Sequence, residues 1–247
     1  LMTEPSFYEV SYVINPWMKP QSWSLAPGHQ KRQSMLRWKQ LYNALQKFGV
    51  RICLMDSVEG LPDLVFPANS AVVLDRKILL SRFAFKERQK EEPVYRRFFS
   101  RLLERGEIDE IGELPAGLYQ EGAGDCLWDR HRKHFWAGYG QRSTRAACYV
   151  IERFFQCDVK PLELVDPRFY HLDVAMAVLE NGEVIYFPEA FSPASQSVIK
   201  QLVPAHLRIE TSLCEAIHFN LNTISLLGVI FMTRASARLK AELMSRG

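Results

Sequence analysis

The chain has 247 residues, of which 47% are hydrophobic and 24% charged, as in a globular protein that can bury a sizeable core. The net charge is +3, and the basic residues are dispersed, which argues against a nucleic-acid partner. No apolar run is long enough for a membrane span, and the first residues lack a signal-peptide pattern. The five cysteines form no CxxC pair, so we expect a reducing, cytoplasmic location and no structural zinc.

The hydrophobic pattern predicts five successive units, most of them a hairpin followed by a helix and a strand. In chain order the predicted elements are strand 8–14, helix 35–48 and strand 50–55; strands 64–74 and 78–83, helix 93–106 and strand 108–114; strands 126–128 and 135–139, helix 144–155 and strand 159–165; strands 172–179 and 184–187, helix 193–202 and strand 207–211; strands 217–226 and 229–232 with a turn at Leu227 and Gly228, and helix 235–244.

Repetition at about 45 residues per unit predicts an α/β fold in which similar modules close into a ring. The first unit lacks a hairpin partner, and the fifth stops after its helix. A ring closed by segments from both ends would explain these gaps. We therefore expect about 25 to 35 further residues, including a last strand, beyond Gly247. The alternative is a chain that ends there with an open sheet edge.

Polar residues stand at an equivalent stage of four units. They are Asn15, Asn69, the acidic pair Glu121 and Asp125, and the pair His171 and Asp173. A ring would bring them together at its centre. His171 and Asp173, two positions apart at the head of a predicted strand, would share one face, which suits a general acid/base and a neighbouring anion. Taken alone, this pair is more often a hydrogen-bonded histidine at a strand end.

Two arginines follow these residues at similar distances, Arg88 after Asn69 and Arg142 after Glu121. Arginine binds carboxylates in a bidentate manner, so the pair suits the α-carboxylate of an amino acid. Simpler explanations exist: Arg88 lies in a charged run that could be a solvated loop, and Arg142 could stand at a helix start. The intervening glycines of the Glu121 segment could mark only a tight turn.

Six segments together resemble the guanidine-modifying superfamily of arginine deiminases, dimethylarginine dimethylaminohydrolases, amidinotransferases and arginine dihydrolases. The segments are 15–18, 62–69, 121–125, 138–142, 164–173 and 186–192. The resemblance covers nearly the whole chain and implies the pentein fold, a five-bladed αβ propeller of ββαβ units. Residues 1–247 would then form one domain whose last unit is incomplete.

The resemblance also implies a mechanism and roles for residues. A cysteine thiolate attacks the guanidinium carbon, and His171 protonates the leaving amine and then activates water. Glu121 would hold the guanidinium nitrogens, and Asp173 would flank His171. The residues expected to bind substrate are Asn15, Asn69, Arg88, Asp125 and Arg142. The implied partner is a small guanidino compound such as arginine, with no cofactor, metal, nucleic acid or membrane; a homo-oligomer is left open.

The chain departs from the family pattern at two places. Many deiminases have aspartate where this chain has Asn69, and a neutral amide better tolerates a neutral ureido group. With Asn15, this favours the arginine dihydrolases, which take arginine to ornithine, over simple deimination, dimethylarginine hydrolysis or amidino transfer. The family's nucleophilic cysteine lies near the C-terminus, and we expect it beyond Gly247; Cys126 is predicted to be a packed thiol. A catalytically inactive binding or assembly protein is the alternative of another class.

Overall fold

The structure is a computed structural model that describes residues 1–226 and 228–246, so the turn predicted at Leu227 lies outside the described residues. Three units of the chain repeat one arrangement: two antiparallel strands, a helix, and a third strand parallel to the second. These units are β3 (Ala71–Leu74), β4 (Lys77–Leu80), α4 (Glu92–Glu104) and β5 (Glu110–Gly112); β6 (Cys126–Asp129), β7 (His134–Tyr139), α5 (Ala147–Phe155) and β8 (Val159–Glu163); and β9 (Met176–Val178), β10 (Val184–Tyr186), α6 (Pro193–Leu202) and β11 (Arg208–Glu210).

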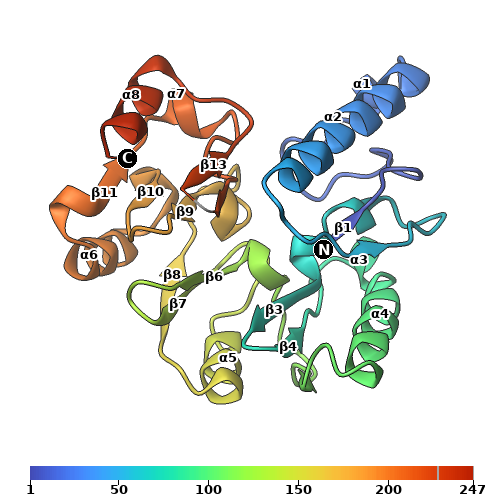
Figure 1. The fold of residues 1–247 in the computed structure, drawn as a ribbon, viewed down its shortest axis with the longest axis horizontal. Helices are drawn as coiled ribbons and strands as arrows, with labels where there is room; N and C mark the ends of the chain where they lie inside the picture. Colours follow the sequence, from blue (N-terminus) through green and yellow to red (C-terminus); the bar gives the residue numbers. More distant parts are fainter. Residues whose placement is uncertain (227, 247) are drawn as a thin grey trace.

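The first and fifth units contain part of this arrangement. In the first, β1 (Met2–Thr3) pairs in parallel with β2 (Leu54–Met55), and the chain between them forms α1 (Pro20–Ser24) and α2 (Pro27–Lys47). In the fifth, α7 (Leu213–Ala216) precedes the antiparallel pair β12 (Ile224–Leu226) and β13 (Val229–Phe231), and α8 (Ala237–Ser245) follows. Figure 1 shows the small sheets gathered around the middle of the molecule, with α2, α4, α5, α6 and α8 outside.

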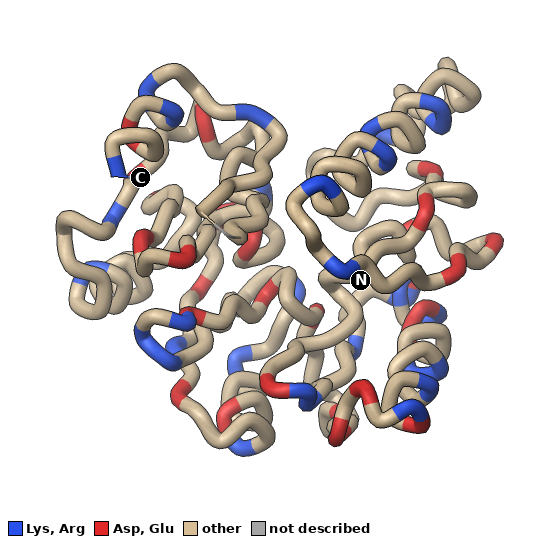
Figure 2. The backbone as a smooth tube through the Cα atoms, in the orientation of Figure 1, with Lys and Arg blue, Asp and Glu red and all other residues tan. Residues whose placement is uncertain are grey.

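Local chemistry explains the modules. The turn between β3 and β4 places Asp75 and Arg76 at φ of 46° and 65°, the left-handed pair of a tight hairpin turn. Apolar faces of the helices then cover the sheets: in the second unit, Tyr95 and Phe99 of α4 pack in one core with Ile78. Charges of both signs are spread along the chain (Figure 2). Within the described residues, no helix combines the length and apolar character needed to cross a bilayer.

Three strand predictions were wrong in a way that matters for the site. Residues 8–14 form no strand; their path is irregular, and side chains rather than a β-ladder hold them, since the Tyr12 hydroxyl donates to Asp63. The strands predicted to start at residues 64 and 172 start later, because 3₁₀ turns occupy Pro67–Ser70 and Leu172–Val174. A third such turn, Gly122–Gly124, precedes β6, so three inner strands each begin with a compact turn.

Candidate active site

The 3₁₀ turn before β6 packs against the 3₁₀ turns before β3 and β9, which brings Asn69, Glu121 and His171 together. Glycine permits this approach. Gly122 has a φ of +62°, and a Cβ there would lie 2.5 Å from the Ala68 carbonyl oxygen. A Cβ on Gly124 would collide with the Asn69 amide nitrogen. These glycines therefore do more than turn the chain: they let the polar side chains of neighbouring units meet.

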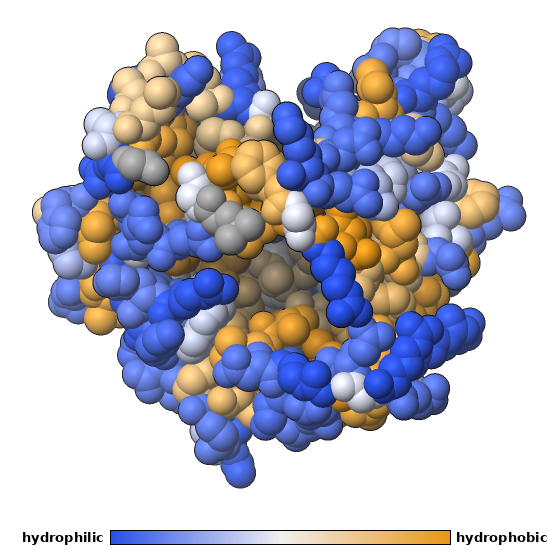
Figure 3. Space-filling view, in the orientation of Figure 1, coloured by the Kyte–Doolittle hydropathy of each residue, from blue (hydrophilic) through white to orange (hydrophobic). Residues whose placement is uncertain are grey.

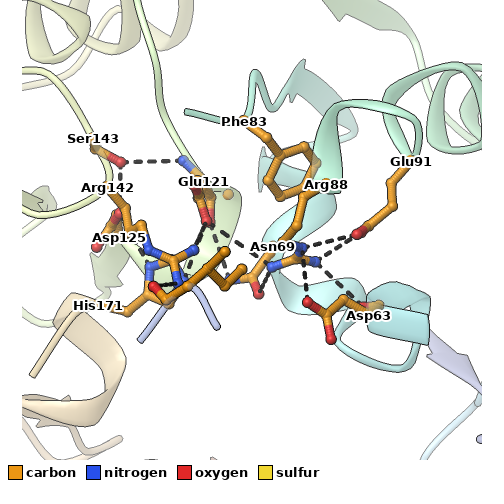
Figure 4. A network of polar contacts seen from close by, with 12 residues as sticks. Asp63, Asn69, Phe83, Arg88, Glu91, Glu121, Asp125, Arg142, Ser143 and His171 are labelled. Atoms are coloured by element: carbon orange, nitrogen blue, oxygen red, sulfur yellow. Dashed lines mark hydrogen bonds and ion pairs between the residues drawn. The ribbon is translucent and has the colours of Figure 1, made fainter. Parts of the chain in front are cut away.

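Glu121 is the centre of the cluster, and its side chain is 0% exposed. Its Oε2 atom lies 3.0 Å from Nη1 of Arg142, 3.4 Å from Nε2 of His171 and 4.0 Å from Nη1 of Arg88 (Figure 4). Its other oxygen, Oε1, is buried and has no hydrogen-bond partner among the described residues. A buried carboxylate oxygen without a donor is costly, so Oε1 is an acceptor available to a bound ligand.

His171 lies between two carboxylates. Its Nδ1 is 3.2 Å from Oδ2 of Asp125, while its Nε2 faces Glu121. Burial lowers the pKa of His171, but the charges of Asp125 and Glu121 outweigh burial, so the pKa is raised above its ordinary value. The imidazole is therefore held toward its protonated form, as a proton donor to a leaving group requires.

Asp125, predicted to bind substrate, is held by groups of the protein itself. Its Oδ1 accepts from the backbone N–H of Leu172 at 3.0 Å, and its Oδ2 accepts from the Ser143 hydroxyl at 2.6 Å. Both oxygens thus point at protein groups, and Oδ2 also faces His171. Asp173, the residue predicted to flank His171, lines a cavity, and its charge interacts with that of His171.

Arg88 is a buried arginine, 3% exposed, whose donors go mainly to the protein. Its Nε and Nη2 hold Glu91 at 2.9 and 2.8 Å, Nη1 donates to Oδ1 of Asn69 at 2.9 Å, and Nη2 also reaches the Asp63 carbonyl. Because Nη1 takes the amide oxygen, the amide nitrogen of Asn69 is directed at the Glu121 carbonyl, 3.3 Å away. Arg88 therefore fixes which way the Asn69 amide points.

Arg142 ties the N-terminal segment to the cluster. Its Nη2 donates to the Ile14 carbonyl at 2.9 Å, and its guanidinium lies over the rings of Phe85 and Tyr170, 4.6 and 5.1 Å from their centroids. Asn15 follows in the chain, and its side-chain oxygen accepts from the backbone N–H of Trp17. Asn15 thus lies beside the cluster in a turn, with its amide nitrogen as the polar group left for a ligand.

Three residues of this network were not predicted from the sequence: Asp63, Glu91 and Ser143. Asp63 and Glu91 pair with Arg88, and Ser143 contacts both acids of the third unit. The sequence carried a signal for one of them, since Asp63 lies in the same segment as Asn69. Glu91 stands in a charged run that resembles a solvated loop, yet it is 1% exposed.

A cavity of about 270 Å³ lies along the inner strands β3, β6 and β9, and Figure 3 shows the molecule hollowed at its middle. Its walls are largely apolar, and Asp173 is the carboxylate among them. Burial raises the pKa of Asp173 to about 7, against the opposing charge of His171. The cavity thus begins where the polar cluster ends.

The cysteine thiols of this region are not activated. Burial raises the pKa of Cys126 well above its ordinary value and that of Cys148 to about 11, and it raises the pKa of Cys157 as well. A thiol with a raised pKa is a poor nucleophile near neutral pH. Cys214 is exposed within α7, and Cys53 precedes β2. Among residues 1–226 and 228–246, no three His, Cys, Asp or Glu side chains could together hold a metal ion.

Comparisons with known proteins identify the family of the chain. Residues 14–242 match the family described as N,N dimethylarginine dimethylhydrolase, eukaryotic. The bifunctional arginine dihydrolase/ornithine cyclodeaminases AgrE of Nostoc sp. and ArgZ of Synechocystis sp. are 37% and 38% identical to the whole chain. The dimethylarginine dimethylaminohydrolase of Mycobacterium tuberculosis is 34% identical over 91% of this chain and 69% of its own. The chain spans 34% of the length of AgrE and ArgZ, about a third.

Solved structures extend the match to the fold. The N-terminal domain of ArgZ with bound substrate superposes with a TM-score of 0.90 at 36% identity, covering 100% of this chain and 87% of that one. A dimethylarginine dimethylaminohydrolase adduct gives a TM-score of 0.72 at 18% identity, covering 88% and 80% of the two chains, which shows the shared fold alone. By its sequence and fold, the chain is a member of the guanidine-modifying superfamily, whose fold is the pentein. Within that class, the chain belongs to the dimethylarginine dimethylaminohydrolase family, in its arginine dihydrolase-like branch.

Proposed function

We propose that this chain forms a guanidino-group hydrolase domain that acts on arginine or a close analogue through a covalent thiouronium intermediate. The observation that carries the proposal is the buried Oε1 of Glu121, an acceptor without a donor among the described residues, beside a histidine with a raised pKa. A planar guanidinium supplies N–H donors to such an oxygen. Crystals of ArgZ with its substrate and of AgrE with L-arginine support this substrate class.

The chemistry follows from these groups. A thiolate attacks the guanidinium carbon while Glu121 holds the nitrogens. The carbon–nitrogen bond then breaks, and His171 gives its Nε2 proton to the departing ammonia. Neutral His171 next takes a proton from water, whose oxygen attacks the same carbon and releases the thiolate. One round converts arginine and water to citrulline and ammonia; a second, with another water, releases ornithine, ammonia and carbon dioxide.

The nucleophile in this proposal is a cysteine outside residues 1–247. The raised pKa values of Cys126, Cys148 and Cys157 support this, because these thiols stay protonated. In the relatives, the complexes of ArgZ with substrate and of AgrE with L-arginine were obtained with a cysteine replaced. A further ArgZ variant is covalently bound to a reaction intermediate, which fits covalent catalysis there.

Further parts of the proposal concern binding. Arg142 and Arg88 take the substrate carboxylate, Arg142 foremost, because Arg88 already directs four of its five N–H groups at protein acceptors. Asn15 and Asn69 contact the substrate, and Asp173 is a second carboxylate near His171. Residues 1–247 act as one domain of a five-bladed propeller. A cytoplasmic location fits the five cysteines, which are all free.

The products of arginine decide between one and two hydrolytic rounds. We expect the purified full-length protein to convert L-arginine to ornithine, with ammonia released in a ratio of two to one. Amino-acid chromatography with an ammonia assay measures both. Citrulline that accumulates without ornithine would instead identify a deiminase. Turnover of dimethylarginine in preference to arginine would instead identify a dimethylarginine dimethylaminohydrolase.

The Asn69→Asp substitution should raise the share of citrulline among the products. A carboxylate attracts the cationic guanidinium of arginine but offers no donor to a neutral ureido group, so the second round slows more than the first. We expect the ratio of citrulline to ornithine to rise about tenfold or more, which corresponds to about 1.4 kcal/mol of discrimination. Asn43→Asp on the exposed face of α2 makes the same chemical change and should leave the ratio unaltered. An unchanged ratio in Asn69→Asp contradicts the role assigned to this amide.

A further inference from the structure

One hydroxyl group connects the two acids of the cluster. Ser143 Oγ accepts from the backbone N–H of Glu121 at 3.2 Å and donates to Oδ2 of Asp125 at 2.6 Å. The donor and acceptor of both hydrogen bonds are fixed, because a backbone N–H can only donate and a carboxylate can only accept. Ser143 is 7% exposed and Asp125 is 1% exposed, so water does not replace these contacts. Figure 4 shows Ser143 above this group of side chains.

Asp125, which Ser143 holds in place, contacts the His171 region at two points. Its Oδ1 holds the backbone N–H of Leu172, the residue after His171, and its Oδ2 lies 3.2 Å from Nδ1 of the ring. This ring contact is close in distance but is not aligned as a hydrogen bond, so its attraction is that of an ion pair. A carboxylate facing Nδ1 favours hydrogen on that nitrogen, so Nε2, which faces the guanidino site beside Glu121, is the atom that exchanges a proton.

We infer that Ser143 and Asp125 are positioning residues that hold His171 with Nε2 toward Glu121 and the bound guanidino group, Ser143 acting through Asp125. The inference rests on the proposed function for its kinetic consequence, but the arrangement of the ring does not depend on turnover. Other groups also face His171: Glu121 and Arg142 from the third unit, Asp173 from its own turn, and the Tyr170 ring. Of these charges, Asp125 alone lies on the Nδ1 side within contact distance.

The test compares Asp125→Asn, Ser143→Ala, Ser143→Thr and the double variant Asp125→Asn with Ser143→Ala in the full-length protein. Asp125→Asn should move the basic limb of the pH profile of kcat to lower pH by about one unit, the effect of removing one close charge. Ser143→Ala should lower kcat about tenfold with little change in KM, and Ser143→Thr, which keeps the hydroxyl, should restore most of it. In the Asp125→Asn background, Ser143→Ala should add less than about twofold, because its partner is gone.

Titration of His171 by NMR, assigned with His171→Gln, separates this inference from the proposed function. In the Asp125→Asn protein the His171 midpoint should fall, whether or not any guanidino compound is turned over. An unshifted midpoint in a variant whose circular dichroism is native overturns the inference. Additive losses in the double variant would do the same for the action of Ser143 through Asp125. If the His171 midpoint falls in Asp125→Asn but the wild-type full-length protein processes no guanidino substrate, the proposed function fails and the positioning role stands.

Discussion

Replacing Glu121 with glutamine in the full-length protein is expected to lower kcat/KM for arginine by at least about 10³-fold, the cost of removing a preorganised charge from the reacting group. In the part of the chain that the structure describes, the Glu121 carboxylate is the one anion that lies within 4.0 Å of all three of the cations Arg88, Arg142 and His171. Glutamine keeps the shape but leaves those charges facing an amide. Steady-state kinetics over a range of arginine concentrations measures the loss.

The same substitution should destabilise the protein by about 3 kcal/mol, because breaking a buried ion pair leaves uncompensated charge. Glu215→Gln provides the matched control. Glu215 is 7% exposed and pairs with Arg238 at 2.7 Å, but it belongs to α7 and lies outside the polar cluster. Its loss should lower the midpoint of chemical denaturation while kcat/KM stays within about twofold. Retention of more than a tenth of wild-type kcat/KM by Glu121→Gln would contradict the assignment of the guanidinium site.

The repeated plan of the chain made the central residues predictable. Asn69, Glu121 and His171 stand at the same stage of successive units, so any ring of these units brings them together, and they do lie together. What the pattern could not supply was the direction of each side chain within the cluster. Asp125 and Asp173 are both acidic and both close to predicted strands, and only the packed 3₁₀ turns decide which carboxylate comes within contact distance of Nδ1 of the imidazole.

Contacts between distant parts of the chain were the least predictable. The N-terminal segment alternates as a strand would, yet Arg142 binds the Ile14 carbonyl across 128 residues, and that contact replaces a β-ladder. Glu91 looked like part of a solvated loop because its neighbours are charged. It is buried because Arg88 turns inward to reach Asn69, and a buried arginine needs a carboxylate beside it. The composition of a local stretch cannot predict which of its charged side chains will be buried.

Asp173→Asn is expected to stabilise the protein at pH 8 by about 2 kcal/mol and to leave its stability unchanged near pH 4. Burial raises the pKa of Asp173 to about 7, so the folded protein binds this proton more tightly than the unfolded protein does. Stability therefore falls as the pH rises from about 4 to 7, and the asparagine variant escapes that loss. The full shift corresponds to about 4 kcal/mol; we halve it because the cavity beside the carboxyl admits screening.

Denaturant titrations at pH 4, 6 and 8 measure the effect of Asp173→Asn, which keeps an acceptor for the side chain of Asn222. Asp166→Asn is the control of opposite sign. Hydrogen bonds from Arg168 lower the pKa of Asp166, so its ionised form stabilises the fold at high pH, and this variant should lose less than about 1 kcal/mol at pH 8. If the gain of Asp173→Asn were the same at all three pH values, it would come from packing. That result would contradict the claim that ionisation of Asp173 destabilises the fold at high pH.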